Sequence, residues 1–239
     1  MTVLSVVQQA SSVLGLAIPS TLFSQTDRTS VEIQYMINFC AKQLLDEYAW
    51  ERLLKRHVLI GDAVTEAFDL PADYDRMTVA SHFWSNQMPF WNGVQIGSLD
   101  EWIAIEATGF IAMVTPIWII FGGQIHVIQP LGTGETLTYP YVSNLIVRSQ
   151  GSTSPVGDKP EFTEDTDSFI IDERVLRTCF VYNWKLAKGF DYSSELQELQ
   201  NAFSYAVGKD KGPRVIREGV SNRLWAGLGG SPWPFGGTL

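Results

Sequence analysis

The sequence predicts an α+β protein in which N- and C-terminal helices form one helical bundle, with an inserted mixed β region and an extended C-terminal arm. Apolar residues recur at three- and four-residue spacings near both ends of the chain, which indicates amphipathic helices. Short alternating segments separated by turn residues fill the middle. The last residues contain seven Gly and three Pro, which favours extended backbone. The predicted domains are a helical bundle from residues 1–56 and 168–210, an inserted β-rich domain with a short helix at residues 57–167, and an arm at residues 211–239.

Two helices are predicted near the N-terminus. The first covers residues 2–14 and stops near Gly15. The second covers residues 27–54 and opens with Asp27 as a candidate N-cap. Two helices joined by a short loop normally pack as a hairpin. The apolar side of the second helix is wide, so it requires further partners from elsewhere in the chain.

The inserted region begins with a predicted hairpin of residues 57–60 and 66–70 about Gly61-Asp62. Two aromatic-rich strands are then expected at residues 79–84 and 90–96. A short helix should follow over residues 98–108, because Ser98 and Glu101 form a capping box.

The clearest hairpin joins residues 118–121 to 124–128, because Gly122-Gly123 can adopt the positive φ angles of a two-residue turn. Residues 136–142 alternate like a further strand. Residues 149–167 are rich in Gly, Ser, Thr, Pro and acids, which predicts a long exposed loop. Such a loop is uncommon unless it contacts something.

Two C-terminal helices are predicted at residues 172–188, where Gly189 ends the pattern, and at residues 191–207. The second has the strongest apolar periodicity in the chain. Their apolar faces supply the partners that the helix at residues 27–54 requires, so both ends of the chain should share one core.

Charge is unevenly distributed along the 239 residues, whose formal net charge is −9. Residues 211–239 contain four basic residues and one acidic residue, so the arm carries about +3. The body keeps 13 basic and 25 acidic residues, or −12. An acidic body argues against a broad nucleic-acid surface, because phosphate binding depends on clustered Lys and Arg. A basic arm suits an acidic protein partner.

Cys40 and Cys179 both fall on apolar helical faces and are predicted to be reduced core residues. The N-terminus lacks the basic and continuous apolar segments of a signal peptide. The apolar run at residues 110–121 is interrupted by Pro116 and is too short to span a bilayer. We therefore expect a protein made in the cytoplasm, without a membrane segment.

No pattern of catalytic, metal-binding or cofactor-binding residues is recognised. His57, His82 and His126 lack metal-ligand spacing. The acids of residues 158–173 lack the spacing and central glycine of a calcium loop, so a solvated loop ending in helix caps is favoured. Gly132-Thr133-Gly134 is interpreted as a turn, because no Gly-Lys-Ser/Thr follows it. The sequence thus predicts a protein without enzymatic activity.

Several segments, taken in order, resemble a known family over about residues 1–210. They are Tyr48-Ala49-Trp50-Glu51, Phe68-Asp69-Leu70-Pro71-Ala72-Asp73-Tyr74-Asp75-Arg76, Gly122-Gly123-Gln124-Ile125, Tyr139-Pro140-Tyr141-Val142-Ser143-Asn144, Asp165-Thr166-Asp167 and Trp184-Lys185-Leu186-Ala187-Lys188-Gly189-Phe190-Asp191-Tyr192. This combination resembles the head-to-tail adaptor proteins of tailed bacteriophages, also called head-completion or tail tubular proteins.

The resemblance implies a virion protein at the head–tail junction, assembled in the host cytoplasm. Such proteins form a homo-oligomeric ring, usually of twelve copies, beneath the portal protein. The ring also contacts a tail nozzle or other tail proteins, and double-stranded DNA passes through its lumen without sequence-specific binding. The acidic body suits a lumen that must not hold DNA.

The resemblance also implies that the C-terminal arm reaches along the portal. Its basic and aromatic residues suit the grooves and acidic surface of a partner; they are Arg214, Ile216, Arg217, Arg223, Leu224, Trp225, Trp233 and Phe235. On the helix at residues 27–54, Tyr35 and Leu45 are candidate subunit-interface residues.

Two other functions compete with the adaptor interpretation. A carbohydrate-binding or enzymatic tail component would use Trp84, Trp91 and the acidic loop. With Phe83 and Phe90 these tryptophans form an aromatic cluster that suits a ligand pocket or stacking on sugars or bases. Core packing or a subunit interface is the alternative role of that cluster. A DNA-end-binding factor would need basic surface that the body lacks.

Overall fold

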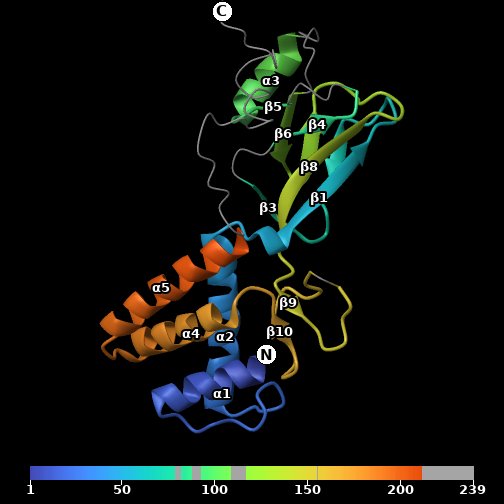
Figure 1. The fold of residues 1–239 in the computed structure, drawn as a ribbon. Helices are drawn as coiled ribbons and strands as arrows, with labels where there is room; N and C mark the ends of the chain where they lie inside the picture. Colours follow the sequence, from blue (N-terminus) through green and yellow to red (C-terminus); the bar gives the residue numbers. More distant parts are fainter. Residues whose placement is uncertain (79–81, 88–92, 109–116, 155, 212–239) are drawn as a thin grey trace, which may run out of the picture. The chain divides into compact units, whose positions relative to one another are not determined.

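The computed structural model describes residues 1–78, 82–87, 93–108, 117–154 and 156–211 (Figure 1). Its helices and sheets confirm the mixed α+β class. The chain divides into a helical unit, comprising Met1–Val58, Asp69–Ser81 and Tyr139–Gly212, and a β unit that includes Leu59–Phe68 and His82–Thr138. Residues 139–167, which the sequence assigned to the insertion, group with the helices.

Four helices belong to the helical unit: α1 (Val3–Leu14), α2 (Arg28–Glu47), α4 (Glu173–Lys188) and α5 (Ser193–Asp210). Their ends follow the sequence signals. The Asp27 carboxylate accepts a hydrogen bond from the Ser30 amide at 3.1 Å, and Asp172 caps α4 in the same way. Gly15 and Gly189 adopt the left-handed conformation that ends a helix.

The predicted helix at residues 27–54 is too long, because α2 ends at Glu47. Tyr48 is extended, and a 3₁₀ turn at Glu51–Leu53 leads into strand β1 (Leu54–Ile60). The buried indole of Trp50 explains the break. Its Nε1 donates a hydrogen bond to the Leu44 carbonyl at 2.8 Å, which satisfies an acceptor that helix continuation would otherwise use.

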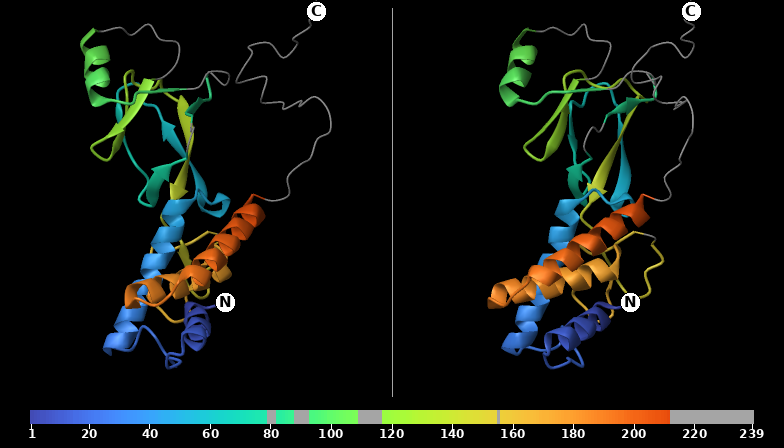
Figure 2. Two further views of the ribbon diagram at one scale, coloured as in Figure 1. Left: turned by 90° about the vertical axis from the view of Figure 1, so that its left-hand side faces the viewer. Right: turned by 60° about the vertical axis from the view of Figure 1, so that its left-hand side comes forward.

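Helix α4 lies at the centre of the helical unit, where it packs against α1, α2 and α5 (Figures 1 and 2). The first two helices were predicted to pack on each other as a hairpin. This prediction is wrong, since α1 makes its close backbone contacts with α4. Cys40 and Cys179 are free and buried in this core, as predicted. Asn183 donates a hydrogen bond to the Gln43 side chain at 3.0 Å, which satisfies a buried amide between α2 and α4.

Strands β1, β8 (Thr136–Ser143) and β3 (Tyr74–Met77) form one sheet in the order β1-β8-β3, and β4 (Trp84–Ser85) pairs with the start of β8. Strands β9 (Val147–Arg148) and β10 (Ser168–Phe169) form a separate antiparallel pair.

The predicted hairpin about Gly61-Asp62 is wrong, because β1 does not pair with β2 (Ala67–Asp69). Strand β1 pairs with β8, whereas β2 joins the sheet of β7. The segment between them is held by other contacts. The Gly61 amide bonds to the Glu135 carbonyl at 2.8 Å, and the Asp62 carboxylate accepts the Thr65 amide at 2.7 Å.

The β unit contains the hairpin of β6 (Ile117–Phe121) and β7 (Gln124–Val127), as predicted. Its turn residues Gly122 and Gly123 have φ angles of 60° and 80°, which glycine adopts without strain. Strand β5 (Val94–Gln95) runs parallel to β6, and helix α3 (Leu99–Thr108) buries Trp102 against the same small core. The predicted strand segments at residues 79–81 and 90–92 lie outside the described residues.

Gly157 provides a test of packing in the helical unit. A Cβ atom at this position would collide with the Leu145 carbonyl, whereas a Cβ at Gly208, inside α5, would meet nothing within 4 Å. We expect Gly157→Ala to destabilise the protein and Gly208→Ala to stabilise it by about 0.5–1 kcal/mol through helix propensity. Urea unfolding followed by circular dichroism measures both changes. Equal effects of the two substitutions would contradict the close backbone approach at Gly157.

Asp73 joins strands β1 and β8 through its side chain. It accepts hydrogen bonds from Lys55 Nζ at 2.6 Å, the Ser143 hydroxyl at 2.7 Å and the Tyr141 hydroxyl at 2.8 Å. Partial burial raises the pKa of Asp73, but these donors outweigh burial and lower the pKa from 3.8 to about 2. The ionised carboxylate is therefore the stabilising form.

This depressed pKa predicts a specific acid sensitivity. A group with a lowered folded-state pKa contributes stability above its unfolded pKa and loses that contribution as pH falls through the folded value, here between about pH 4 and pH 2. We expect Asp73→Asn to lower the free energy of unfolding at pH 7 and to flatten its decline between pH 4 and pH 2. Urea titrations at several pH values measure this. An unchanged slope in the variant would exclude the Asp73 contribution.

Candidate functional site

The histidines of the chain lie in separate aromatic contacts. His57 lies beside Tyr139 with ring centroids 5.6 Å apart, and His126 stacks on Phe121 at 3.8 Å. Within the described residues, no group of three His, Cys, Asp or Glu side chains is arranged to hold a metal ion.

The acids of the loop before α4 bind protein donors. Asp165 Oδ1 accepts the backbone amides of Leu22 and Phe23 at 3.0 and 2.9 Å. Asp167 is fully buried, accepts the Thr163 and Glu164 amides, and lies 3.0 Å from Lys159 Nζ. These carboxylates therefore order the loop and attach it to the helices. Sequence reasoning missed this buried pair, although the run Asp165-Thr166-Asp167 was visible.

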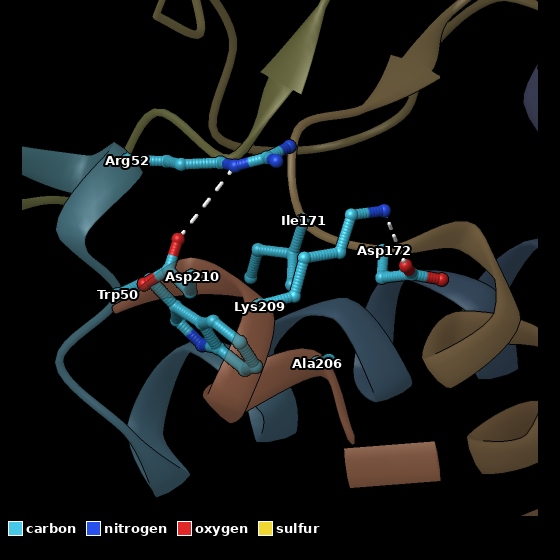
Figure 3. Close-up of a pocket in the computed structure, with 7 residues that line it drawn as sticks. All are labelled: Trp50, Arg52, Ile171, Asp172, Ala206, Lys209 and Asp210. Carbon is cyan, nitrogen blue, oxygen red and sulfur yellow. Dashed lines mark hydrogen bonds and ion pairs between the residues drawn. The ribbon is translucent and has the colours of Figure 1, made fainter. Parts of the chain in front are cut away.

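Figure 3 shows a small polar pocket between the 3₁₀ turn and the last turn of α5. Its lining residues are Trp50, Arg52, Ile171, Asp172, Ala206, Lys209 and Asp210. Arg52 Nε lies 3.6 Å from Asp210, and Lys209 Nζ lies 3.4 Å from Asp172. The Asp210 side chain is 3% exposed and also accepts the Glu51 amide at 2.6 Å.

The volume of this pocket decides its role. It measures about 10 Å³, which is room for no more than a single water molecule. Its charged residues are joined to one another, so the arrangement holds the C-terminal end of α5 against the 3₁₀ turn. The Trp50 ring reinforces this joint by an edge contact with Phe203 of α5 at 5.7 Å. The pocket is a structural joint at the base of the C-terminal arm.

A second, larger cleft is polar. It measures about 340 Å³ and includes the Met1 amine, Arg52, Arg148, Glu173 and Lys209. The Met1 amine forms an ion pair with Glu173, and the Arg52 guanidinium donates to the Ile170 carbonyl at 3.1 Å. The lining carries four cationic groups against the carboxylates of Asp172 and Glu173, and these two carboxylates form ion pairs with Lys209 and the Met1 amine.

A third and larger concave surface of the helical unit lies between α2 and the loop that precedes β10. We call it the α2 groove; its volume is about 650 Å³. It is lined by Phe23, Val31, Gln34, Tyr35, Asn38, Phe39, Lys42, Glu161, Phe162 and Thr163. Three of these residues, one helical turn apart on α2, are exposed apolar side chains: Val31 at 49%, Tyr35 at 70% and Phe39 at 44%. Such a stripe is typical of a protein-binding surface.

The Asn38 side chain fixes the shape of the α2 groove. The Asn38 side chain donates to the Phe162 carbonyl at 3.2 Å and accepts the Phe162 amide at 2.8 Å. Lys42 lies 3.1 Å from Glu161 across the same gap. Because one amide side chain satisfies both backbone groups of Phe162, the loop is held to the helix and the groove is preformed.

The predicted site residues separate into three groups. Tyr35 lies on the α2 groove, in an exposed position that suits an interface. Leu45 is 5% exposed and belongs to the core, so it is not available to another subunit; a charge there would disturb folding instead. The predicted arm residues, Arg214 to Phe235, lie outside the described residues.

The aromatic cluster considered for ligand binding is partly accounted for. Phe83 is fully buried and packs on Trp118 with ring centroids 4.2 Å apart, so it belongs to the core of the β unit. Trp84 is partly exposed on β4. Phe90 and Trp91 lie outside the described residues.

Comparison with models of known protein families gives no match, and comparison with curated proteins gives none either. Among the described helices, none combines the length and the apolar character needed to cross a lipid bilayer. The functional argument therefore depends on the surfaces described above and on the sequence resemblance.

The two hydrogen bonds between the Asn38 side chain and the Phe162 backbone should contribute measurably to the free energy of unfolding. Replacing Asn38 with Ala leaves the amide and carbonyl of Phe162 without their partner, which should cost about 1–3 kcal/mol. Urea unfolding measures the loss. As a matched control, Gln197→Ala changes an exposed amide on α5 and should alter stability by less than about 0.5 kcal/mol. Comparable losses in both variants would contradict a specific role for Asn38.

Proposed function

We propose that this protein is a structural head-to-tail adaptor of a tailed bacteriophage. It forms a ring below the portal, links the capsid to the tail and lines the DNA exit channel, and its C-terminal arm docks on the portal. The observation that carries this proposal is the α2 groove, an exposed apolar surface on a rigidly supported helix. The resemblance of six sequence segments to the adaptor proteins supports this proposal, and the groove offers a surface for assembly.

A closed ring requires two different surfaces on every subunit, because each copy contacts one neighbour on either side. The α2 groove offers one. The turn between α4 and α5 offers a second exposed apolar group, with Leu186 at 44% and Phe190 at 61%. Phe190 directly follows the left-handed Gly189, a position whose hydrophobic residue frequently packs back on its own helix. Its exposure supports a role in contact with a neighbour.

The charge distribution supports a passive relation to DNA. A body with charge −12 repels phosphate, which favours passage of double-stranded DNA over retention. The basic arm suits an acidic portal surface, and a tail nozzle or other tail proteins would complete the junction. A carbohydrate-binding tail component would use the acidic loop, but its Asp165 and Asp167 are engaged by backbone amides and Lys159.

Two exposed tyrosines allow a matched test of the ring. Tyr35, 70% exposed in the α2 groove, and Tyr205, 63% exposed on α5, contribute similarly little to the core. We expect Tyr35→Asp to abolish ring formation on a cognate portal, because it places a charge in an apolar contact. Tyr205→Asp should leave assembly intact. Negative-stain imaging of each protein mixed with the portal gives the result.

Circular dichroism and urea unfolding should show that both tyrosine variants fold like the wild type. Absence of rings with the wild-type protein would refute the adaptor proposal. Normal rings with Tyr35→Asp would remove the α2 groove from the subunit interface.

A further inference from the structure

We propose that in the free subunit the α2 groove is occupied by the part of the C-terminal arm that follows Lys211, until binding to a portal removes it. Release by the portal rests on the proposed function. The contact between arm and groove does not depend on the proposed function, because it is inferred from the groove in the helical unit and from the sequence of the arm. The pairing would hide the surface for a neighbouring copy, so that ring assembly starts only where a portal is present.

The chemistry of the α2 groove selects an apolar occupant. Its polar lining is already satisfied: Asn38 bonds to Phe162, and Gln34 donates to the Leu22 carbonyl at 2.7 Å. The exposed apolar surface comes from Val31, Tyr35 and Phe39, and the Lys42–Glu161 ion pair is also exposed. A volume of about 650 Å³ is in the range that accommodates several large side chains. An occupant therefore gains free energy mainly by burying aromatic or aliphatic groups.

The arm has the side chains that such a groove binds. Leu224, Trp225, Trp233 and Phe235 are large and apolar, and Trp is among the residues that dominate binding energy at interfaces. The surrounding Gly and Pro residues cannot bury these side chains in a core of their own.

Charge complementarity points to the same partner. The loop at residues 158–167, which forms one wall of the α2 groove, contains five acids and one lysine. Its Glu161 and Glu164 side chains are 49% and 62% exposed and form surface ion pairs with Lys42 and Lys159, which leaves the loop with an excess of acids. The arm contributes Arg214, Arg217 and Arg223 against a single acid. Basic residues of the arm would thus lie along an acidic wall while its aromatic residues enter the groove.

The arm also starts close enough to reach the groove. Lys211 lies over the ring of Tyr48, at the C-terminal end of α2, with Nζ 5.2 Å from the ring centroid. Phe39 precedes Tyr48 by nine residues, which is a distance of about 14 Å along the helix axis. The 14 residues from Lys211 to Trp225 can extend to about 50 Å. A segment tethered so near reaches an effective concentration in the millimolar range, which favours it over an arm from another molecule.

Site-specific cross-linking of the full-length chain tests this contact without a portal. Lys42→Cys places a thiol at the edge of the α2 groove, and Ser231→Cys places one beside Trp233 in the arm. Tyr205→Cys replaces Lys42→Cys in the control. Tyr205 is exposed and lies six residues from Lys211, just as Lys42 lies six residues from Tyr48, but it is not part of the α2 groove. The native cysteines are buried and do not compete.

With a short bis-maleimide, we expect the groove pair to cross-link within one chain about tenfold faster than the control pair. Adding Phe39→Ser should reduce the rate toward the control, and adding a cognate portal should do the same. Peptide mass spectrometry identifies the linked residues, and gel mobility separates links within a chain from links between chains. Equal rates for both pairs, links only between chains, or no effect of Phe39→Ser would overturn the proposal.

The two proposals fail separately. Cross-linking in the groove pair without rings on a portal would refute the adaptor function and leave the arm contact standing. Rings on a portal without preferential cross-linking would do the reverse.

Discussion

The helical unit depends on the burial of α4. This helix packs against α1, α2 and α5, so that its apolar residues close one core made from both ends of the chain. Because α1 and α4 are separated by more than 150 residues, their contact closes a long stretch of chain at an entropic cost that the buried core must offset. The consequence for function is rigidity. A helix such as α2, held along one side by α4, can present its other side without changing shape on binding.

The acidic loop before β10 has a structural task that its composition does not suggest. Asp165 and Asp167 accept backbone amides, Lys159 neutralises the buried Asp167, and Asn38 fixes Phe162. Long loops are usually variable surface elements. Here the hydrogen bonds hold the loop in place, and it forms one wall of the α2 groove. The exposed acids of the loop give this wall negative charge. Asp165 and Asp167 thus order the loop, whereas the exposed Glu161 and Glu164 carry charge at its surface.

Local chemistry made much of the fold predictable. Asp27 and Asp172 mark helix starts, Gly189 marks a stop, and Gly122-Gly123 marks the hairpin, because caps and turns depend on few neighbouring atoms. Pairing over distance was not predictable. The partner of β1 is β8, nearly 80 residues away, and only tertiary packing selects it over the nearer β2.

In the candidate site, too, local features were predictable from the sequence, whereas contacts between distant segments were not. Tyr35 and Leu45 both fall on apolar stripes of one helix, and the sequence assigns them equally to an interface. Their opposite burial depends on what packs around α2: Leu45 is enclosed within the core, whereas Tyr35 remains exposed beside the loop around Phe162. The α2 groove itself could not be foreseen, since its second wall comes from residues more than 110 positions further along the chain.

The exposed aromatic pair on α2 is not required by the fold. Tyr35 and Phe39 stack with centroids 6.3 Å apart, a spacing of one helical turn that contributes about 0.2–0.5 kcal/mol to a helix. Polar residues at the two positions would give nearly the same stability and a more soluble surface. A folding requirement therefore does not account for two adjacent large aromatic side chains in this place. A binding partner that covers Tyr35 and Phe39 would gain free energy from their burial, which supports the proposed role of the α2 groove.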